Sequence, residues 1–422
     1  VDGDASGYSL TDAADTDTLS VPAAATELDE VWTCSITAND GSTDGPTGTA
    51  NVTILTRYVD CGDGVIGLPI ATCEDLEAIS EDGAETYCLV NDVDCSTIAD
   101  FDTVAISVGG IGFSGVLLGN GYAVTDFSTT GSGLFRKLSG EVRDLTMTNV
   151  LLVPTATKAG AIAGSMLGAP LIHNVHITGA IDATAISEFG DYTIRSIGGL
   201  VGSTQTISDG EITDSTFSGT INGGDNVGGI IGVTQGITIS GCSVTGTITG
   251  ERYLGGIVGS KSAGGTPGVL TLSDCSFSGD IIGDTVVGGI CGTCGGLGST
   301  MTIDRCLSEG TVTALDGSAG GLVAINNAPI RDSGSHSAVV GTTVVGGLVG
   351  SYSNGDLRTI YATVERSFAT GDVVGEGKVG GLIGSALFIR VFDSYALGDV
   401  DGAAQYVGGF MGWTLEGGEF ER

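Results

Sequence analysis

The sequence predicts an all-β protein whose chain winds into a β-helix (β-solenoid). A phrase of two glycines, two hydrophobic residues and a glycine recurs through the second half of the chain, at intervals of 26 to 38 residues. Between these phrases, β-branched residues alternate with polar ones. A period of this size is typical of stacked repeats, each of which adds one coil. The phrases lie at 198–202, 228–232, 255–259, 288–292, 320–323, 346–350, 380–384 and 408–412, with a degenerate first copy at 160–164.

A second recurring motif lies about halfway between two phrases. It starts with serine or cysteine and ends in glycine, aspartate and a β-branched residue, as in 275–281, 367–373 and 394–400. The pair of motifs resembles the GLUG repeat, which is named for its Gly-Leu-hydrophobic-Gly core and occurs in large bacterial surface and secreted proteins. The resemblance covers about residues 61–422. It implies a scaffold rather than a particular activity.

The composition favours a folded chain with many turns. The 422 residues include 74 glycines and 7 prolines, and 41% of them are hydrophobic. Average glycine usage is about 7%, so this excess indicates tight turns, while the hydrophobic content argues against disorder. No apolar run reaches the roughly 18 residues of a membrane span. The chain starts at Val1, and we expect a processed form or a piece of a longer polypeptide.

The chain is strongly acidic. Its net charge of −35 repels phosphate backbones and anionic membrane surfaces, which argues against nucleic acid as a partner. One interpretation is a solvated surface that keeps a long β structure soluble. The other is calcium binding through acidic loops, because Ca²⁺ prefers several oxygen ligands. The calcium candidates are Asp12, Asp15, Asp17 and Asp40, and no other cofactor is expected.

Ten cysteines indicate an oxidising, extracellular setting. Cys242, Cys275 and Cys306 occupy equivalent places in successive repeats. Stacked coils lie about 4.8 Å apart, a separation that a disulfide accepts. We therefore expect a disulfide between neighbouring coils here, which would pair two of these three cysteines.

The cysteines of the N-terminal region are also candidates for structural disulfides. Cys73, Cys88 and Cys95 lie close enough in sequence for one local bridge, with Cys61 or Cys34 as other partners. Sequence spacing alone leaves these pairings open.

Residues 1–60 differ from the repeats and are expected to form a separate module. Apolar residues alternate on both sides of a turn at 39–41, which predicts antiparallel strands. The order of Trp32, Cys34, the turn and 52–54 resembles the last strands of an immunoglobulin-like (cadherin-like) bacterial module. The resemblance implies a partial β-sandwich whose open edge is covered by another segment or by a neighbouring subunit's strand. Alternatively, this segment folds alone in another way.

Residues 61–159 are expected to form an N-terminal cap and the first irregular coils. Thr72 at a helix N-cap, an acidic residue three positions later, and Leu76 with Ile79 on one face predict a short helix that ends at about Ser80. A helix here would cover the end of the solenoid core, where repeat proteins need a cap. Alternation between glycine turns in 101–159 predicts the first coils.

Residues 160–422 are expected to form the regular GLUG-repeat solenoid. Each repeat is predicted to supply about three short strands: the glycine phrase, a strand such as 237–239 and a strand such as 246–248. At 408–422 no second helix closes the core, so we expect an open end that favours stacking. The predicted repeat-core residues are Leu200, Ile230, Ile257, Ile290, Leu322, Leu348, Leu382 and Phe410.

Few residues are candidates for catalysis or metal binding. His173 and His176 are three residues apart, which in a strand puts their side chains on opposite faces; with His336 they are expected to be surface or groove residues. Cys291 and Cys294 could form a structural disulfide, a zinc site or a redox pair, and loose spacing around them favours the disulfide. β-Helix lyases and hydrolases need carboxylates and basic residues in one groove, but the basic residues here are sparse and out of register.

These observations favour a non-enzymatic structural subunit of an extracellular bacterial fibre or surface stalk, which self-associates head to tail through incomplete ends. The first alternative is an adhesin or glycan-binding surface protein, in which exposed aromatic residues such as Tyr361, Tyr395 and Trp413 contact host or environmental glycans or proteins. The second alternative is a β-helix carbohydrate-active or protease-associated protein.

Overall fold

The computed structural model describes residues 31–39, 44–53, 58–62, 64–79, 84–103, 112–184, 195–207, 210–262, 268–295, 301–352, 362–403, 406–415 and 419–421. The chain forms two compact units, Val1–Tyr58 and Val59–Arg422. In the first unit, β1 (Val31–Asn39) and β2 (Asp44–Thr53) form the antiparallel hairpin that the alternating residues predict. The immunoglobulin-like sandwich depends mainly on residues outside the described ranges, so it stays a prediction.

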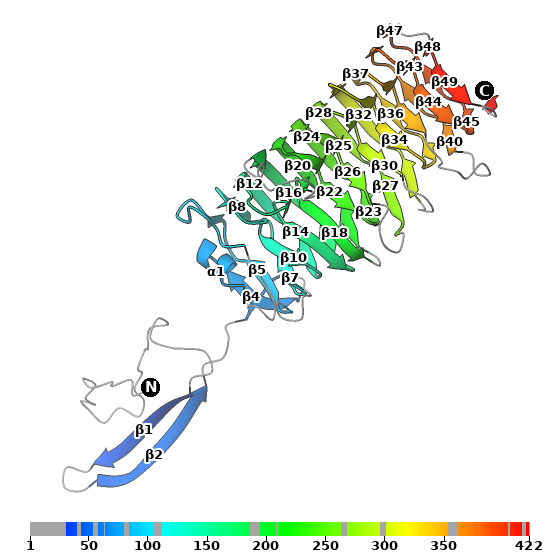
Figure 1. Ribbon diagram of the computed structural model, residues 1–422. Helices are drawn as coiled ribbons and strands as arrows, with labels where there is room; N and C mark the ends of the chain where they lie inside the picture. The colour runs from blue at the N-terminus through cyan, green and yellow to red at the C-terminus, as the bar shows by residue number, and fades with distance from the viewer. Residues whose placement is uncertain are drawn as a thin grey trace. The chain divides into compact units, whose positions relative to one another are not determined.

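The second unit is a β-solenoid, as the repeats predict. Four sheets extend along its axis (Figure 1). Neighbouring strands of a sheet come from successive coils, so each strand pairs with its equivalents in the coils before and after it. Among the described strands of this unit, the ladders are parallel except for the pair β3–β4.

Two sheets contain most of the strands. The fourteen-strand sheet comprises β3 (Val59–Asp60), β4 (Ile66–Ile70), β5 (Thr86–Leu89), β7 (Val116–Leu118), β11 (Glu141–Arg143), β15 (Leu171–His173), β19 (Glu211–Thr213), β23 (Ile237–Ser240), β27 (Leu270–Ser273), β31 (Met301–Asp304), β35 (Ile330–Arg331), β40 (Ala362–Glu365), β45 (Ile389–Phe392) and β50 (Glu419–Glu421). The fifteen-strand sheet comprises β6 (Val93–Asp94), β8 (Ala123–Thr125), β9 (Ser128–Thr129), β12 (Thr146–Leu152), β16 (His176–Asp182), β20 (Thr216–Asn222), β24 (Ser243–Gly250), β28 (Ser276–Gly283), β32 (Leu307–Ala314), β36 (Gly334–Ser335), β37 (Ala338–Gly341), β41 (Phe368–Ala369), β42 (Val373–Gly375), β46 (Tyr395–Ala396) and β47 (Val400–Gly402).

Two smaller sheets complete the later coils. The ten-strand sheet comprises β10 (Phe135–Leu138), β14 (Ala163–Gly168), β18 (Val201–Ile207), β22 (Ile231–Thr234), β26 (Val258–Lys261), β30 (Cys291–Cys294), β34 (Val323–Asn326), β39 (Val349–Tyr352), β44 (Ile383–Leu387) and β49 (Met411–Leu415). The nine-strand sheet comprises β13 (Lys158–Ala159), β17 (Ser196–Gly198), β21 (Asp225–Gly228), β25 (Arg252–Gly255), β29 (Val286–Gly288), β33 (Ser318–Gly320), β38 (Val344–Gly346), β43 (Lys378–Gly380) and β48 (Tyr406–Gly408).

One coil passes through all four sheets, as β21, β22, β23 and β24 do in sequence. The prediction of about three strands per repeat, with the glycine phrase as one of them, is therefore wrong. Gly228 ends β21 and Ile231 starts β22, so the phrase forms the bend between the nine-strand and ten-strand sheets.

Glycine is required in this bend because neighbouring backbones approach closely. A Cβ atom on Gly198 would lie under 3.0 Å from the carbonyl oxygen of Val201, and one on Gly199 equally close to that of Gly229 in the next coil. The hydrophobic residue that follows, Leu200, is buried in the core. The phrase thus combines two tight backbone contacts with one core side chain.

A second corner joins the fourteen-strand and fifteen-strand sheets through one left-handed residue in each coil from β11 onward. The φ angle at this position lies between 45° and 63°, a region that aspartate, asparagine and glycine adopt more readily than other residues. We call these residues the corner column: Asp144, Asn174, Asp214, Gly241, Asp274, Arg305, Asp332, Arg366 and Asp393.

Hydrophobic side chains from the four sheets fill one continuous core. In the first coils this core contains aromatic pairs, with ring centroids 4.4 Å apart for Phe113 and Phe135 and 4.8 Å apart for Phe101 and Phe127. In the last coil Phe410 is half-buried. The other repeat-core residues are fully buried: Leu200, Ile230, Ile257, Ile290, Leu322, Leu348 and Leu382.

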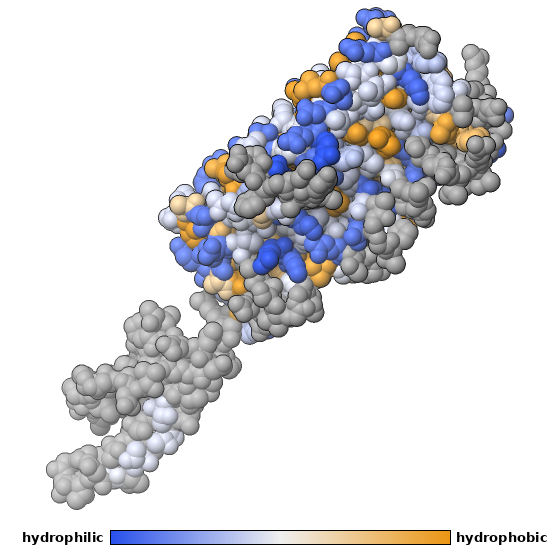
Figure 2. All heavy atoms as spheres, viewed as in Figure 1, coloured by the Kyte–Doolittle hydropathy of each residue, from blue (hydrophilic) through white to orange (hydrophobic). Residues whose placement is uncertain are grey.

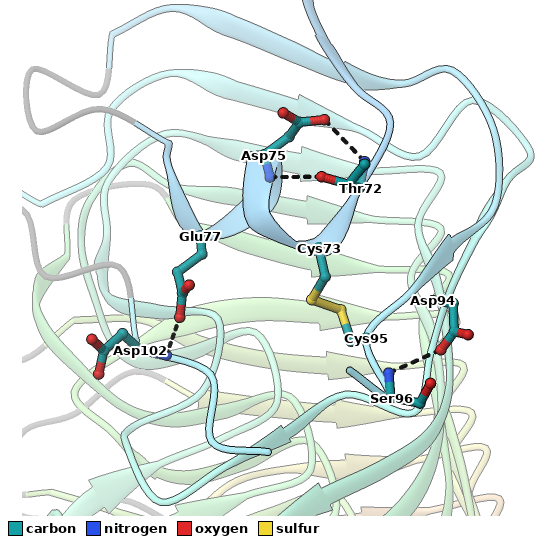
Figure 3. The surroundings of a disulfide bond; sticks show 8 residues. All are labelled: Thr72, Cys73, Asp75, Glu77, Asp94, Cys95, Ser96 and Asp102. Atoms are coloured by element: carbon teal, nitrogen blue, oxygen red, sulfur yellow. Dashed lines mark hydrogen bonds between the residues drawn. A yellow bond between two sulfur atoms is a disulfide. The ribbon is translucent and has the colours of Figure 1, made fainter. Parts of the chain in front are cut away.

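A short helix, α1 (Cys73–Glu77), covers the N-terminal end of this core (Figure 3). The Thr72 side chain accepts a hydrogen bond from the Asp75 N–H at 3.2 Å, and the Asp75 carboxylate accepts one from the Thr72 N–H at 3.0 Å. This is the reciprocal cap that the sequence predicts. Leu76 and Ile79 are buried in the core. The helix ends at Glu77, before the predicted end, since Ala78 already has non-helical backbone angles.

Candidate functional site

An aromatic stack lies on the fifteen-strand sheet in the last coils. Phe368 and Tyr395 are register partners in neighbouring coils, and their rings are stacked with centroids 5.6 Å apart. The ring of His336 lies 5.0 Å from that of Phe368. The Phe368 ring passes over Gly334, where a side chain would collide with it. Because Tyr395 is 49% exposed, the stack presents an aromatic surface to solvent.

A shallow apolar groove lies on the same sheet. It has a volume of about 340 Å³ and is lined by 313–315, 340–342, 374–376, Asp401 and Ala403. Val340 and Val374 are register partners and are both exposed, and Leu315 is 60% exposed. Figure 2 shows hydrophobic residues along the edge of the unit at which Figure 1 labels β28 and β37. Contiguous exposed apolar residues of this kind mark interaction surfaces.

Carboxylates line the groove, and two more follow the residues of the aromatic stack in the sequence. Glu376 and Asp401 line the groove, and the Asp372 side chain accepts a hydrogen bond from the Asp399 N–H at 3.0 Å. Among the described residues that line the groove, none is basic. A flat aromatic face beside hydrogen-bond acceptors is suited to a ligand with an apolar face and several hydroxyl groups.

The histidines take part in contacts between coils. His173 ends β15 and His176 starts β16, so the two lie on either side of the corner column rather than on one strand. In each histidine, Nδ1 lies within hydrogen-bond distance of a threonine Oγ1 in the following coil: 2.8 Å from His173 to Thr213, 3.0 Å from His176 to Thr216 and 2.6 Å from His336 to Thr370.

The calcium candidates Asp12, Asp15, Asp17 and Asp40 lie outside the described residues, so calcium binding stays a prediction. In the described part of the chain, no three His, Cys, Asp or Glu side chains lie close enough together to hold a metal ion. That part also contains no helix long and apolar enough to cross a membrane.

Disulfides fasten the cap and one wall of the solenoid. One of them joins α1 to the segment after β6 (Figure 3). Another joins the two ends of β30, which is the structural role predicted for that pair. The side chain of Cys34 lies outside the described part of the chain. The disulfides among the described residues are Cys61–Cys88, Cys73–Cys95 and Cys291–Cys294.

The expected disulfide between neighbouring coils is not formed. Cys242, Cys275 and Cys306 follow the corner column in successive coils, but all three are buried free thiols. Their S–H groups turn toward backbone carbonyls, as Cys275 does toward Ser273 at 3.2 Å. A side-chain hydrogen bond with Cys242, together with burial, raises the pKa of Cys275 to about 12.

Serines occupy the same place in flanking coils. The Ser333 hydroxyl donates to the carbonyl oxygen of Arg331 at 2.6 Å and accepts from the N–H of Cys306, one coil earlier, at 3.0 Å. Ser367 and Ser394 repeat this arrangement. The small polar residue therefore bonds the corner of one coil to the next, a role that serine and cysteine can both fill.

Sequence reasoning missed the charged members of the corner column. Arg305 and Arg366 each donate two hydrogen bonds to an aspartate of the preceding coil, Asp274 and Asp332 respectively. A signal was present, since each of these residues directly precedes the recurring serine or cysteine. Comparing that single position between repeats would have shown the alternation of charge.

The predicted ligand-binding aromatic residues differ in their surroundings. Tyr395 belongs to the aromatic stack. Trp413 is half-buried, and the Nζ of Lys378 lies 3.8 Å from the centroid of its ring, so a cation already covers that ring. Tyr361 lies outside the described residues.

Comparison with known proteins supports the scaffold. The family model of the GLUG motif matches residues 195–222, one coil that runs from β17 to β20. No curated protein matches the sequence. One of the solved structures with some similarity to this chain is that of a Bacteroides ovatus protein named, provisionally, as an immunoglobulin A1 protease. The two sequences are 14% identical, the match covers 82% of this chain and 84% of that one, and the TM-score is 0.26. So low a TM-score gives no basis for transferring an activity. The chain is therefore a β-solenoid protein that carries the GLUG motif.

Proposed function

We propose that this chain is a non-enzymatic structural rod, a subunit of an extracellular bacterial fibre or surface stalk. The observation that carries the proposal is the continuity of the parallel ladders, which link consecutive coils from β4 to β50 in the fourteen-strand sheet. Each inner strand is hydrogen-bonded on both sides. A force that stretches or bends the solenoid is therefore distributed over many backbone hydrogen bonds.

Side-chain columns support the same role. The corner column contributes ion pairs between coils, and the serines and cysteines behind it contribute buried hydrogen bonds. The three disulfides among the described residues suit an oxidising environment outside the cell. An acidic surface favours a soluble, well-separated rod.

Head-to-tail self-association is part of this proposal. Strands β46 to β50 lie at the edges of their sheets, and a further coil would continue their hydrogen bonding. A following coil requires glycine at this position of the phrase. At Gly381, for example, a Cβ atom would collide with the carbonyl oxygen of Gly409 in the next coil. Gly409 itself has open space at the same position. A methyl group added there should leave the fold intact but block a further coil.

Electron microscopy of purified wild-type chain and of Gly409→Ala, each with and without a calcium chelator, tests the proposal. We expect filaments from wild type and single rods from the variant, with equal melting temperatures for both. Filaments from both proteins would place the joint elsewhere. Single rods from both proteins would contradict the proposal that the chain forms a fibre. Turnover of a polysaccharide or peptide would contradict the proposal that it is not an enzyme.

A second candidate function is glycan binding, which the aromatic stack and the apolar groove favour. Stacking on the exposed ring of Tyr395 would hold one sugar ring. Glu376 and Asp401 in the groove would accept hydrogen bonds from the hydroxyl groups of another sugar of the same glycan. Glycan-array binding by wild type that is lost in Tyr395→Ala would support it. Tyr406→Ala is a matched control, since Tyr406 is also exposed but lies on the nine-strand sheet. Equal binding by all three proteins would exclude this surface.

A further inference from the structure

Three basic residues surround a small hollow between the ten-strand and nine-strand sheets in the first coils. The hollow has a volume of about 210 Å³. Arg136 and Lys137 belong to β10, and Lys158 starts β13. Figure 2 shows strongly hydrophilic residues over the strands that Figure 1 labels β10 and β14. The other lining residues are Ser132, Ala156, Thr157, Gly164, Ser165 and Gln205.

The charge of this hollow is opposite to that of the chain. The whole sequence has only 15 lysines and arginines against 50 acidic residues, and three of those 15 line one hollow. None of its described lining residues is acidic. Elsewhere on the solenoid, Arg252 pairs with Asp225 of the preceding coil at 2.8 Å.

Lys137 and Lys158 are half-buried and lie close enough for their charges to interact, while Arg136 is exposed. Burial, and then the positive charge of Lys137, lower the pKa of Lys158. Both effects disfavour the charged form of the Lys158 amine. An anion bound in the hollow would stabilise that charged form. Neutral polar groups line the inner wall, where Gln205 Nε2 donates to Ser165 Oγ at 3.1 Å and Ser165 is only 4% exposed.

We propose that this hollow binds a single small oxyanion group, such as a carboxylate or a sulfate. A guanidinium can grip such a group with two hydrogen bonds, and the two ammonium groups add charge. The volume is below the roughly 300–1,000 Å³ of sites for drug-sized ligands, so one charged group enters rather than an extended ligand. The acidic surface around it repels polyanions, which selects an isolated anion, either free or on an acidic sugar.

Calorimetric titration at constant ionic strength tests this site, with sodium sulfate and sodium glucuronate as the two probes. We expect binding by wild type and at least about tenfold weaker binding by Lys158→Gln and by Arg136→Gln, the loss of one charged hydrogen bond. Lys378→Gln is the matched control, because it removes a lysine charge from the last coils instead. Melting temperatures verify that the variants are folded.

The two probes separate the sources of the anion. Tighter binding of glucuronate than of sulfate would assign the hollow to acidic sugars, and the reverse order to mineral anions; both results support the site. Absence of binding for both probes, or equal binding by wild type and by the Lys158 and Arg136 variants, overturns it. The site stands apart from the glycan-binding candidate, so Tyr395→Ala should bind sulfate as wild type does.

Discussion

The guanidinium of Arg305 donates two hydrogen bonds of 2.7 Å to the carboxylate of Asp274, one coil earlier on the corner column. Arg366 does the same to Asp332, at 2.7 and 2.8 Å. Arginine adopts the left-handed conformation of this corner less readily than aspartate or glycine does. Its presence at two of these positions therefore indicates that pairing between coils offsets the local backbone cost.

The pairing should depend on salt. Asp274→Asn keeps a side chain suited to the left-handed corner but removes the charge, so we expect a small loss in melting temperature at low ionic strength. The loss should vanish at about 1 M salt, where the Debye length is about 3 Å. Asp393→Asn is the control, since Asp393 shares the corner but forms no ion pair with the described residues. An equal loss in both variants at every salt concentration would contradict the prediction.

The same pairs predict a contribution to stability in acid. Hydrogen bonds from Arg305 and Arg366 lower the pKa values of Asp274 and Asp332 below the ordinary value of 3.8. A depressed carboxyl pKa stabilises the fold above the ordinary value, and this stabilisation is lost as the pH falls through the lowered one. The melting temperatures of wild type and of an Arg305→Gln, Arg366→Gln variant should therefore differ most near neutral pH and converge in acid, once the pH is below the lowered pKa values. A constant difference would argue against these pairs.

The glycine phrase predicts a sharp contrast between two alanine substitutions. Gly381→Ala should destabilise by at least about 2 kcal/mol, because the new methyl group collides with backbone of the next coil. Gly409→Ala, in the same place of the last phrase, meets no atom within 4 Å and should change the free energy of unfolding by less than about 0.5 kcal/mol. Denaturant unfolding measures both, and similar losses would show that the bend tolerates a side chain.

The buried thiols predict that Cys275→Ser is tolerated. Serine already occupies this place in other coils, where its hydroxyl donates to a carbonyl and accepts an N–H, so stability should change by no more than about 1 kcal/mol. In the native protein Cys242, Cys275 and Cys306 should also resist alkylation, because burial excludes the reagent and a raised pKa keeps Cys275 protonated. Peptide mapping would detect labelled thiols or a bridged pair, either of which contradicts this account.

The cap disulfide should matter more than the one inside β30. The Cys73–Cys95 pair closes a loop with a separation of 22 residues, for which chain entropy gives about 3 kcal/mol, whereas a separation of 3 gives about 2 kcal/mol or less. Replacing both cap cysteines by serine should also accelerate amide exchange in α1 first. Replacing Cys291 and Cys294 together is the control. Equal effects of the two double variants would show that the cap does not depend on its bridge.

Much of the fold could be predicted because the same sequence pattern recurs in every repeat. The period, the buried hydrophobic position and the capping box around Thr72 follow from local patterns. The four-strand coil could not be predicted in the same way, since a glycine phrase forms a strand or a bend depending on how close the next backbone lies. The uneven spacing of the phrases has a simple origin: two residues, 235–236, separate β22 from β23, whereas eight, 262–269, separate β26 from β27.

The candidate surfaces were harder to foresee. Tyr395 could be proposed as exposed, but its stack with Phe368 depends on the register between two coils. Arg136 and Lys158 are 22 residues apart in the sequence and meet only because β10 and β13 face one hollow. The thiols behind the corner column recur in successive coils, as a disulfide between coils would require, and only the structure shows that they are free and contact carbonyls instead.

The four-strand coil also bears on how such rods change over evolution. Every regular coil begins and ends at an equivalent bend and contacts chiefly the coils next to it, so duplication or loss of one whole repeat leaves the cross-section and the N-terminal cap unchanged. Each such event alters the length by about 4.8 Å. The length of the solenoid therefore changes in equal steps. Recombination between repeats of its gene can add or remove a coil, and no new contact between coils has to evolve.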